Sequence, residues 1–252
     1  KTILSDVSMV VQPGEVLAIC GPNGAGKSSL LKILSSELPP SSGRVFFDGR
    51  SLNDWEPRAL ARRRAVLPQH STLAFPFQVL DVVSLGRLPH GRTTGDEEII
   101  FKCLDFVNAR HLAERRYPTL SGGEKQRVQL ARVLAQLYGT TSDPCLLFLD
   151  EPTSALDMEH QNTLFDIVDQ LRETMDISVV VVVHDLNIAA ARADRILLLY
   201  QGEKVLTGAP VEVLTPEMIA STFSVSVHIL EHPTTGRPLV VPDYTVRKNG
   251  GK

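Results

Sequence analysis

The sequence lacks the marks of a membrane-spanning, secreted or nucleic-acid-binding chain. Its longest aliphatic run, ISVVVVV at residues 177–183, is far shorter than the ~18–20 apolar residues that a membrane-spanning helix needs, and we expect a buried strand there. The first residues contain no positive segment followed by a long apolar core, so we expect no signal peptide. The net charge of −3 argues against a broad basic surface for nucleic acid.

Cysteine is also scarce. Cys20, Cys103 and Cys145 are widely spaced, and none belongs to a metal-type pair. This usage predicts three reduced and mostly buried thiols in a cytosolic protein. Cys20 directly precedes a glycine-rich loop, so we expect a packed strand residue whose alkylation would still reduce the activity of that loop.

The chain is long enough to bury a sizeable core, with 252 residues of which 43% are hydrophobic. Strand-like runs alternate with helix-like runs and end at polar or glycine-rich turns. The strand-like runs include EVLAIC (15–20), CLLFLD (145–150) and SVVVVVH (178–184). This alternation predicts a parallel α/β sheet whose ligands bind at the carboxyl ends of the strands.

Other segments favour helices. Between residues 49 and 118, helical stretches around 54–64, 79–86 and 96–108 predict a mainly helical insertion. After residue 208, a helix-like run and two short alternating segments predict a small carboxyl-terminal element. Two apolar stripes of helical period predict buried helix faces: Val128, Ala131, Leu134 and Tyr138, and Leu164, Val168, Leu171 and Met175. We interpret Arg58, Arg62, Arg63 and Arg64 as the solvated face of another helix.

A glycine-rich motif follows the first predicted strand. GPNGAGKSS at residues 21–29 fits the pattern G-x-x-x-x-G-K-[ST] and opens a predicted helix, which is the context that a phosphate-binding loop requires. Lys27 would place positive charge at the β- and γ-phosphates, and Ser28 would offer a hydroxyl to Mg²⁺. The candidate ATP-binding residues are Gly21, Pro22, Asn23, Gly24, Ala25, Gly26, Lys27, Ser28 and Ser29.

Two carboxylates end the apolar strand CLLFLD. Asp150 suits Mg²⁺, directly or through water, and Glu151 is our candidate general base. The alternative is that both side chains only cap the following helix. His184 also ends an apolar strand, where a lone histidine is usually a polar terminus. Gln69, in LPQ after a short strand, indicates nothing by itself.

A second candidate anion site lies at LSGGEKQRVQ, residues 120–129. A serine and two glycines precede a helical run, so backbone N–H groups and the positive end of the helix dipole point the same way.

Together, GPNGAGKSS, LPQ, LSGGEKQRVQLAR, LLFLDEP, SALD and VVVVHD resemble, in this order and spacing, the nucleotide-binding subunit of an ATP-binding cassette (ABC) transporter. The resemblance covers nearly the whole chain. It implies an α/β P-loop NTPase fold of the ABC ATPase type, with a RecA-like core sheet, a helical subdomain and a small carboxyl-terminal element. Residues 1–252 would form one nucleotide-binding domain, with the core at 1–70 and 119–208, the helical subdomain at about 71–118 and the carboxyl-terminal element at 209–252.

The resemblance also implies roles for the residues in these motifs. The loop at 21–29 would hold ATP, and Ser28, Gln69 and Asp150 would hold its Mg²⁺. Glu151 would be the catalytic base, Gln69 would reach the lytic water, and His184 would contact the γ-phosphate. In this family an aromatic residue that stacks on adenine lies upstream of LSDVSMVVQPGE, and the chain does not begin with methionine, so we expect both the natural start and this aromatic to precede residue 1.

The second anion site is implied to act on another chain. Ser121, Gly122, Gly123 and Glu124 would bind the γ-phosphate of ATP held by the opposite subunit of a homodimer, arranged head to tail. Asp157, in SALD, would lie at the dimer interface.

Three segments are similar to the ATPase subunits of bacterial haem importers, within the group that imports siderophores, cobalamin and haem. They are PFQVLDVVSLGRLPHG (76–91), VSVHILEHPTTGRPLVVP (225–242) and ARVLAQLYGTTSDPCLLFLDEPTSALD (131–157). The likeness implies an ATPase on the cytoplasmic face of the inner membrane, two polytopic permease subunits that dock at about 69–95, and indirectly a periplasmic haem-binding protein. Siderophore or cobalamin as cargo stays an alternative.

Two other functions are less well matched. A non-transport ABC ATPase acting on ribosomes or DNA usually has two cassettes or long coiled coils, and this chain has one cassette and no sustained heptads. A soluble P-loop kinase would leave LSGGE and SALD unexplained.

Overall fold

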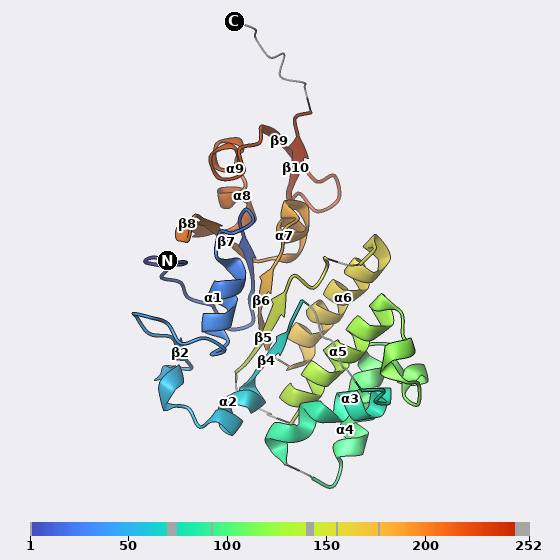
Figure 1. Ribbon diagram of the computed structural model, residues 1–252. Coiled ribbons are helices and arrows are strands. Elements are labelled where there is room, and N and C mark those ends of the chain that lie inside the picture. The colour runs from blue at the N-terminus through green and yellow to red at the C-terminus, as the bar shows by residue number, and fades with distance from the viewer. Residues whose placement is uncertain are drawn as a thin grey trace, which may run out of the picture. The chain divides into compact units, whose positions relative to one another are not determined.

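The computed structural model describes residues 2–69, 75–91, 93–139, 144–154, 156–175 and 177–244. Parts of three features named above lie outside these ranges: residues 70–74 and 92 of the predicted docking region, residues 140–143 of the third haem-importer-like segment, and Ala155 of SALD. Figure 1 labels the elements of the chain, which fall into two compact units. The first combines Lys1–Met9, Leu17–Lys27 and Val183–Lys252, and the second combines Val10–Val16 and Ser28–Val182.

The first unit is built on three paired strands. Strand β1 (Val16–Cys20) pairs in parallel with β7 (Arg195–Tyr200), which pairs antiparallel with β8 (Glu203–Gly208). All five residues of β1 are buried, as expected for a strand covered on both faces. A Cβ atom at Gly21 would lie 2.2 Å from the carbonyl oxygen of Leu199, so only glycine fits there. The glycine loop therefore begins, directly after β1, in close contact with β7.

Three helices and a hairpin complete the first unit. They are α7 (Leu186–Arg192), α8 (Pro210–Val213), α9 (Pro216–Phe223), β9 (Val227–Glu231) and β10 (Pro238–Pro242). The helix predicted after residue 208 is two helices, because Thr215 caps α9 by accepting a bond from the backbone N–H of Met218, 3.2 Å away. The two predicted strands are confirmed as an antiparallel pair, β9 and β10.

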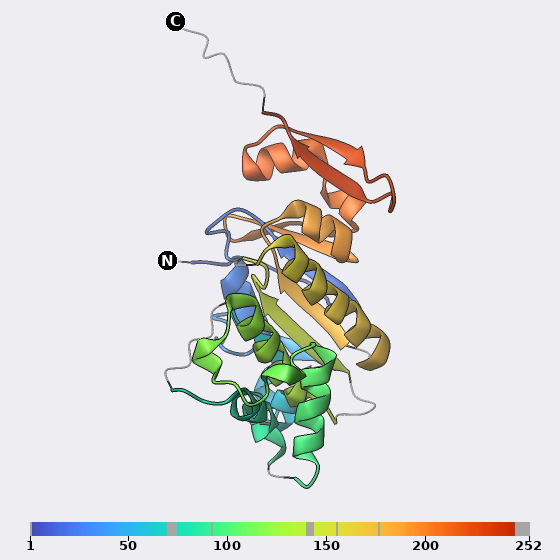
Figure 2. The ribbon, with the colours of Figure 1, turned by 90° about the vertical axis from the view of Figure 1, so that its right-hand side faces the viewer.

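The second unit contains a parallel sheet. Strands β4 (Arg64–Leu67), β5 (Cys145–Asp150) and β6 (Ile177–Val182) run side by side, with Leu149 paired to both Leu67 and Val181. Every residue of β6 is buried, which confirms the predicted buried strand. Helix α6 (Met158–Met175) lies across this sheet (Figure 2). Helix α1 (Lys27–Leu34) begins at the end of the glycine loop.

A group of helices follows in the second unit. The predicted helical stretches correspond to α2 (Pro57–Arg63), α3 (Val79–Ser84) and α4 (Asp96–Phe106), which pack with the 3₁₀ helix η2 (Leu85–His90) and α5 (Gly122–Leu137). The shorter elements are β2 (Phe46–Phe47), β3 (Arg50–Ser51), η1 (Leu52–Asp54), η3 (Arg110–Leu112) and η4 (Tyr117–Thr119). Among the described residues, no helix is both long enough and apolar enough to cross a membrane.

The predicted apolar stripes are largely confirmed. Val128, Ala131 and Leu134 are buried in α5, and Leu164, Val168 and Leu171 are buried in α6. The last residue of each stripe is only half-buried, because Tyr138 follows α5 and Met175 ends α6.

The predicted solvated arginine face is wrong for two of its residues. Arg63 is 8% exposed, and its guanidinium group lies 5.0 Å from the ring centres of both Phe47 and Trp55. It also forms an ion pair with Asp48 at 2.8 Å. Arg64 begins β4 rather than ending the helix, and burial lowers its pKa. Phe47 and Asp48 of the preceding hairpin, together with Trp55 after η1, therefore cover this end of α2.

Candidate functional site

The glycine loop at 21–27 encloses a buried cation within the first unit. Lys27 is 5% exposed, and its Nζ donates to the carbonyl oxygens of Gly21 at 2.9 Å and Pro22 at 3.1 Å. Gly24 and Gly26 have φ angles of 79° and 101°, which glycine adopts readily. A buried ammonium group surrounded by loop backbone is the arrangement that binds phosphate oxygens.

His184 lies beside the start of this loop. The backbone N–H of Val183 donates to the carbonyl oxygen of Ile19 at 3.3 Å. The segment that leads to His184 therefore lies beside the end of β1, where the glycine loop begins. His184 is exposed directly after Val183. Asp185 then caps α7, where its Oδ1 accepts from the backbone N–H of Asn187 at 2.7 Å. The cap fixes the point at which the chain turns from His184 into α7.

Four of the predicted site residues meet in the second unit. The Oγ of Ser28 lies 3.5 Å from Oδ1 of Asp150, at the end of β5. Gln69, after β4, donates from Nε2 to Oε2 of Glu151 at 2.5 Å. Glu151 has a φ of 47°, and its N–H donates to the carbonyl oxygen of Val182 at 3.1 Å. Parallel strands carry these side chains to one edge of the sheet, as the α/β pattern predicts.

The electrostatics of this edge favour a cation. Burial raises the pKa of Asp150, and the negative charge of Glu151 raises it further. A hard cation beside Asp150 would offset both effects, and the hydroxyl and carboxylate oxygens of Ser28 and Asp150 are ligands that Mg²⁺ prefers. Within the described ranges, no three His, Cys, Asp or Glu side chains form a cluster that could hold a metal.

The second predicted anion site forms the first turn of α5. Ser121 accepts from the N–H of Glu124 at 3.3 Å, and Oε2 of Glu124 accepts from the N–H of Ser121 at 2.7 Å. This capping box, with help from Arg115 at 3.1 Å, lowers the pKa of Glu124. Ser121 and Gly122 are exposed, so the start of the helix is open to a ligand or partner.

Asp157 is exposed at the start of α6 and is tied to a residue that the sequence analysis missed. His160 contributes its backbone N–H at 2.9 Å and its ring Nδ1 at 2.6 Å to the same oxygen, Oδ1 of Asp157. These bonds lower the pKa of Asp157. An aspartate three residues before a polar residue at a helix start is a capping signal, which could have identified this pair.

The structure thus brings the predicted residues together in three groups. The first unit holds the glycine loop and His184. The second unit holds the edge with Ser28, Gln69, Asp150 and Glu151, and separately the start of α5 with Asp157 beyond it.

A family model described as ABC transporter matches residues 4–154. The curated Hemin import ATP-binding protein HmuV of Gloeobacter violaceus is 49% identical to this chain over 246 residues, covering 96% of this chain and 89% of that protein. The protein of the same name from Pseudomonas aeruginosa is 50% identical over 243 residues, covering 96% and 94%.

Solved structures show the same likeness. An inward-facing conformation of a putative metal-chelate type ABC transporter has a TM-score of 0.77 and 29% identity, covering 93% of this chain and 88% of that chain. A dimeric ATP-binding cassette in a post-hydrolysis state, bound to ADP and Pi, has a TM-score of 0.70 and 29% identity, covering 82% and 90%.

Proposed function

The chain belongs to the ABC transporter family, and on that premise we propose that it is the ATP-hydrolysing subunit of a haem importer in the bacterial inner membrane. The P-loop NTPase fold and the ATPase class follow from the family. The observation that supports haem as the transported molecule is the 49–50% identity, over 96% of the chain, to proteins named for hemin import.

ATP would bind at the glycine loop. Gly21, Pro22, Asn23, Gly24, Ala25, Gly26, Lys27, Ser28 and Ser29 would contact its phosphates. Mg²⁺ bound with ATP would neutralise charge on the phosphate oxygens, and Ser28, Gln69 and Asp150 would hold it. The 3.5 Å approach of Ser28 to Asp150 supports this assignment.

Glu151 would accept a proton from the attacking water. Its bond from Gln69 supports the role, because an amide donor at 2.5 Å fixes the orientation of the carboxylate. Gln69 would thereby report on the position of the helical segment that follows it. His184 would contact the γ-phosphate, and its exposure beside the glycine loop fits that contact.

Two chains would form a head-to-tail homodimer. Each ATP would then lie between the glycine loop of one chain and Ser121, Gly122, Gly123 and Glu124 of the other, with Asp157 at the interface. The exposure of Ser121, Gly122 and Asp157 supports this arrangement, as does the dimeric state of a solved relative. Binding of ATP would bring the chains together, and hydrolysis would let them separate.

The dimer would dock on two polytopic permease subunits at the cytoplasmic face of the inner membrane. Apolar side chains exposed near the start of the helical group support a docking surface there: Phe75 is 67% exposed and Leu88 is 69% exposed. Haem would be bound by the permease and a periplasmic haem-binding protein rather than by this chain, and nucleic acid would play no part.

The decisive experiment is transport in vesicles reconstituted with the permease and the haem-binding protein. We expect ATP-driven uptake of haem with the parental chain. Glu151→Gln should bind ATP and dimerise but lower the rate of hydrolysis and uptake by about 10³-fold or more, because a general base is lost. Phosphorylation of a metabolite in place of phosphate release would contradict the proposal.

The same role in siderophore or cobalamin import is the second candidate. The likeness to a metal-chelate type transporter favours it. Uptake of a siderophore or cobalamin without uptake of haem, through the same reconstituted permease, would move the cargo to this group and leave the ATPase assignment intact.

A further inference from the structure

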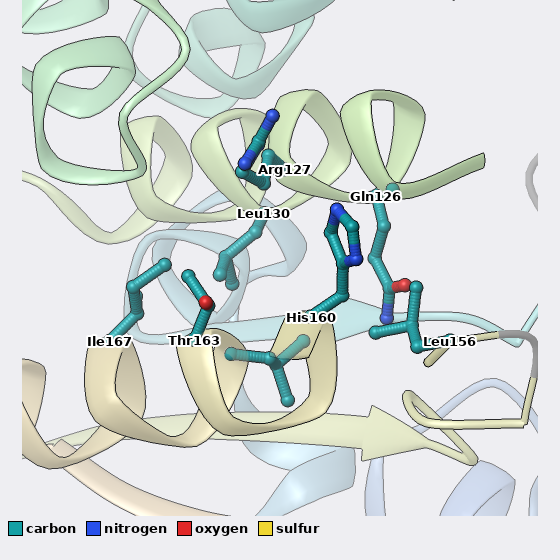
Figure 3. Close-up of a pocket in the computed structure, with 9 residues that line it drawn as sticks. Gln126, Arg127, Leu130, Leu156, His160, Thr163 and Ile167 are labelled. Carbon is teal, nitrogen blue, oxygen red and sulfur yellow. The ribbon is translucent and has the colours of Figure 1, made fainter. Parts of the chain in front are cut away.

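In the second unit, His160 lies between the loop that precedes α6 and the first turn of α5. It lies on α6, three residues after Asp157, and its ring points toward the first turns of α5 (Figure 3). The side chain is 35% exposed, so it is neither a core residue nor a free surface group.

The ring of His160 occupies the space beside Gly123. A Cβ atom at Gly123 would lie 2.6 Å from Cδ2 and 2.8 Å from Nε2 of the imidazole. The neighbouring Gly122 differs, because no described atom comes within 4 Å of a Cβ built there. Gly123 has an ordinary helical backbone, so backbone conformation does not require glycine at this position. A side chain at 123 would instead meet the imidazole ring, which would have to shift.

The other side of the ring holds Asp157. A carboxylate can only accept, so the 2.6 Å contact between Nδ1 and Oδ1 of Asp157 requires a proton on Nδ1. In the neutral ring, Nε2 then carries the lone pair and faces the positive end of the α5 dipole. The ring orientation is therefore set from both sides.

Other contacts confine the loop before α6 but leave an apolar space beneath the ring. Gln126 of α5 donates to the carbonyl oxygen of Pro152, and Gln161 of α6 donates to that of Leu156 at 3.0 Å. Between α5 and α6 lies a pocket whose apolar lining includes Leu130, Leu156 and Ile167 (Figure 3). The ring of His160 and the side chain of Gln126 also line this pocket, so both lie between the ends of the two helices.

We propose that His160 is a positioning residue that holds the Asp157 loop against the first turn of α5, so that these two segments are presented to the partner chain as one surface. The inference rests on the proposed function, which places both segments at the ATP-dependent interface. His160 does not touch the nucleotide in this scheme. It acts through Asp157 and Gly123.

The first test measures ATP-driven dimerisation in the Glu151→Gln background. Adding His160→Ala should raise the dimer dissociation constant about tenfold, because the charged hydrogen bond to Asp157 and the ring contact are both lost. ATP affinity of the monomer and the melting temperature should change little. His160→Asn, whose amide can still donate to Asp157, should recover most of the dimerisation. A role in stability alone would change the melting temperature and not this selective recovery of dimerisation.

The second test separates the ring contact. Gly123→Ala should lower the melting temperature because its methyl group meets the imidazole, whereas Gly122→Ala should leave it unchanged or raise it slightly. Combining Gly123→Ala with His160→Ala should restore the melting temperature. This reversal would show that His160 is the neighbour that excludes a side chain at 123.

Two outcomes would overturn the inference. One is full ATP-driven dimerisation of the His160→Ala protein, with the Glu151→Gln parent dimerising normally. The other is unfolding of both His160→Ala and His160→Asn, which would make His160 a residue of stability alone. If the Glu151→Gln parent itself failed to dimerise with ATP, the proposed function would fail instead, so the two failures are distinguishable.

Discussion

The thiol of Cys20 lies fully buried at the end of β1, directly before the glycine loop. Burial raises its pKa to about 12, against a smaller opposing effect of the nearby charge of Lys27. Because the thiolate is the reactive form, burial disfavours alkylation of Cys20 in the folded protein, and the expected effect of alkylation on activity stays a prediction. The expectation of mostly buried thiols is confirmed for all three cysteines.

We predict that Cys20 resists iodoacetamide at pH 8 in the folded protein and reacts after unfolding, as peptide mass spectrometry would show. The unfolded thiol ionises near pH 9, whereas the native one stays protonated to about 12. Between these values the unfolded state binds fewer protons, so the free energy of unfolding falls as pH rises.

A variant isolates the pH effect. Cys103 has the same shift, to about 12, so Cys20→Ala should remove about half of the loss of stability that these two thiols cause above pH 9. The free energy of unfolding would be measured by denaturant titration at several pH values from 8 to 10. If it fell with pH equally steeply in Cys20→Ala and in the parent, Cys20 would be accessible to solvent.

The sequence motifs identified which residues to consider, but they did not predict how close these residues lie to one another. Ser28 and Asp150 are 122 positions apart, and Gln69 and Glu151 are 82 apart, yet both pairs are in contact. The strand-end rule predicts such meetings because parallel strands end at one edge. It does not predict which atoms bond, and the roles of these residues stay predictions. Arg63 shows what the sequence pattern could not predict. It is buried because Phe47 and Asp48 cover it, and these partners come from a hairpin that periodicity did not reveal.

Among the elements, α7 is attached to the hairpin of β9 and β10 at both of its ends. In its first turn, the amide of Asn187 exchanges two bonds with the backbone of Val240, at 2.7 and 3.1 Å. In its last turn, Arg237 donates to the carbonyl oxygens of Ala190 at 3.0 Å and Ala193 at 2.9 Å. The hairpin therefore holds the helix that begins just after His184.

We predict that Arg237→Ala destabilises this attachment by about 1–2 kcal/mol, because two helix-end carbonyls lose a charged donor. Hydrogen exchange should become faster in α7 and β10, with little change in β5. Arg237→Lys, which keeps the charge but lacks the planar group that spans both oxygens, should give a smaller effect. Equal exchange in all three proteins would mean that the hairpin stands without this contact.

Element boundaries followed their capping residues. The S-x-x-E pattern at 121–124 marks the start of α5 at the residue where the capping box forms. The Thr-Pro pair at 215–216 was an equally clear start signal for α9, and treating the whole segment as one helix overlooked it. The attachment of α7 to the hairpin could not be read from the sequence, because Arg237 follows a turn and its acceptors are backbone atoms of a distant helix.

At the scale of the whole molecule, the chain carries two candidate anion sites on different compact units. The glycine loop belongs to the first unit, and the start of α5 belongs to the second. In the proposed head-to-tail dimer, each glycine loop would face the start of α5 of the other chain, so one interface would create two equivalent composite sites. That symmetry gives a sharper test than any single variant.

We predict that two inactive chains restore activity when mixed. Lys27→Ala should lose ATP affinity at its own loop, and Ser121→Arg should bind ATP but fail to hydrolyse it. In a mixed dimer, the loop of the Ser121→Arg chain meets the intact Ser121 of the Lys27→Ala chain. Half of the dimers would be mixed and half of their sites intact, so phosphate release should reach about a quarter of the parental rate.

The matched control is a single chain that carries both substitutions, mixed with parental protein. In its dimers with the parent, one site lacks Lys27 and the other lacks Ser121, so these dimers should be inactive and added double variant should lower the parental rate. Mixtures of the two single variants that stay inactive at every ratio would contradict the composite site and return the start of α5 to a structural role.

The contact between Gly123 and His160 has an evolutionary consequence. Two positions 37 residues apart in sequence share one small volume, so a side chain at 123 would meet the ring of His160. Descendants of this chain that acquire alanine or serine at 123 should also carry a smaller residue at 160, whereas position 122 should vary independently of it. The pair would thus leave a trace of correlated substitution between two motifs that their separate descriptions do not connect.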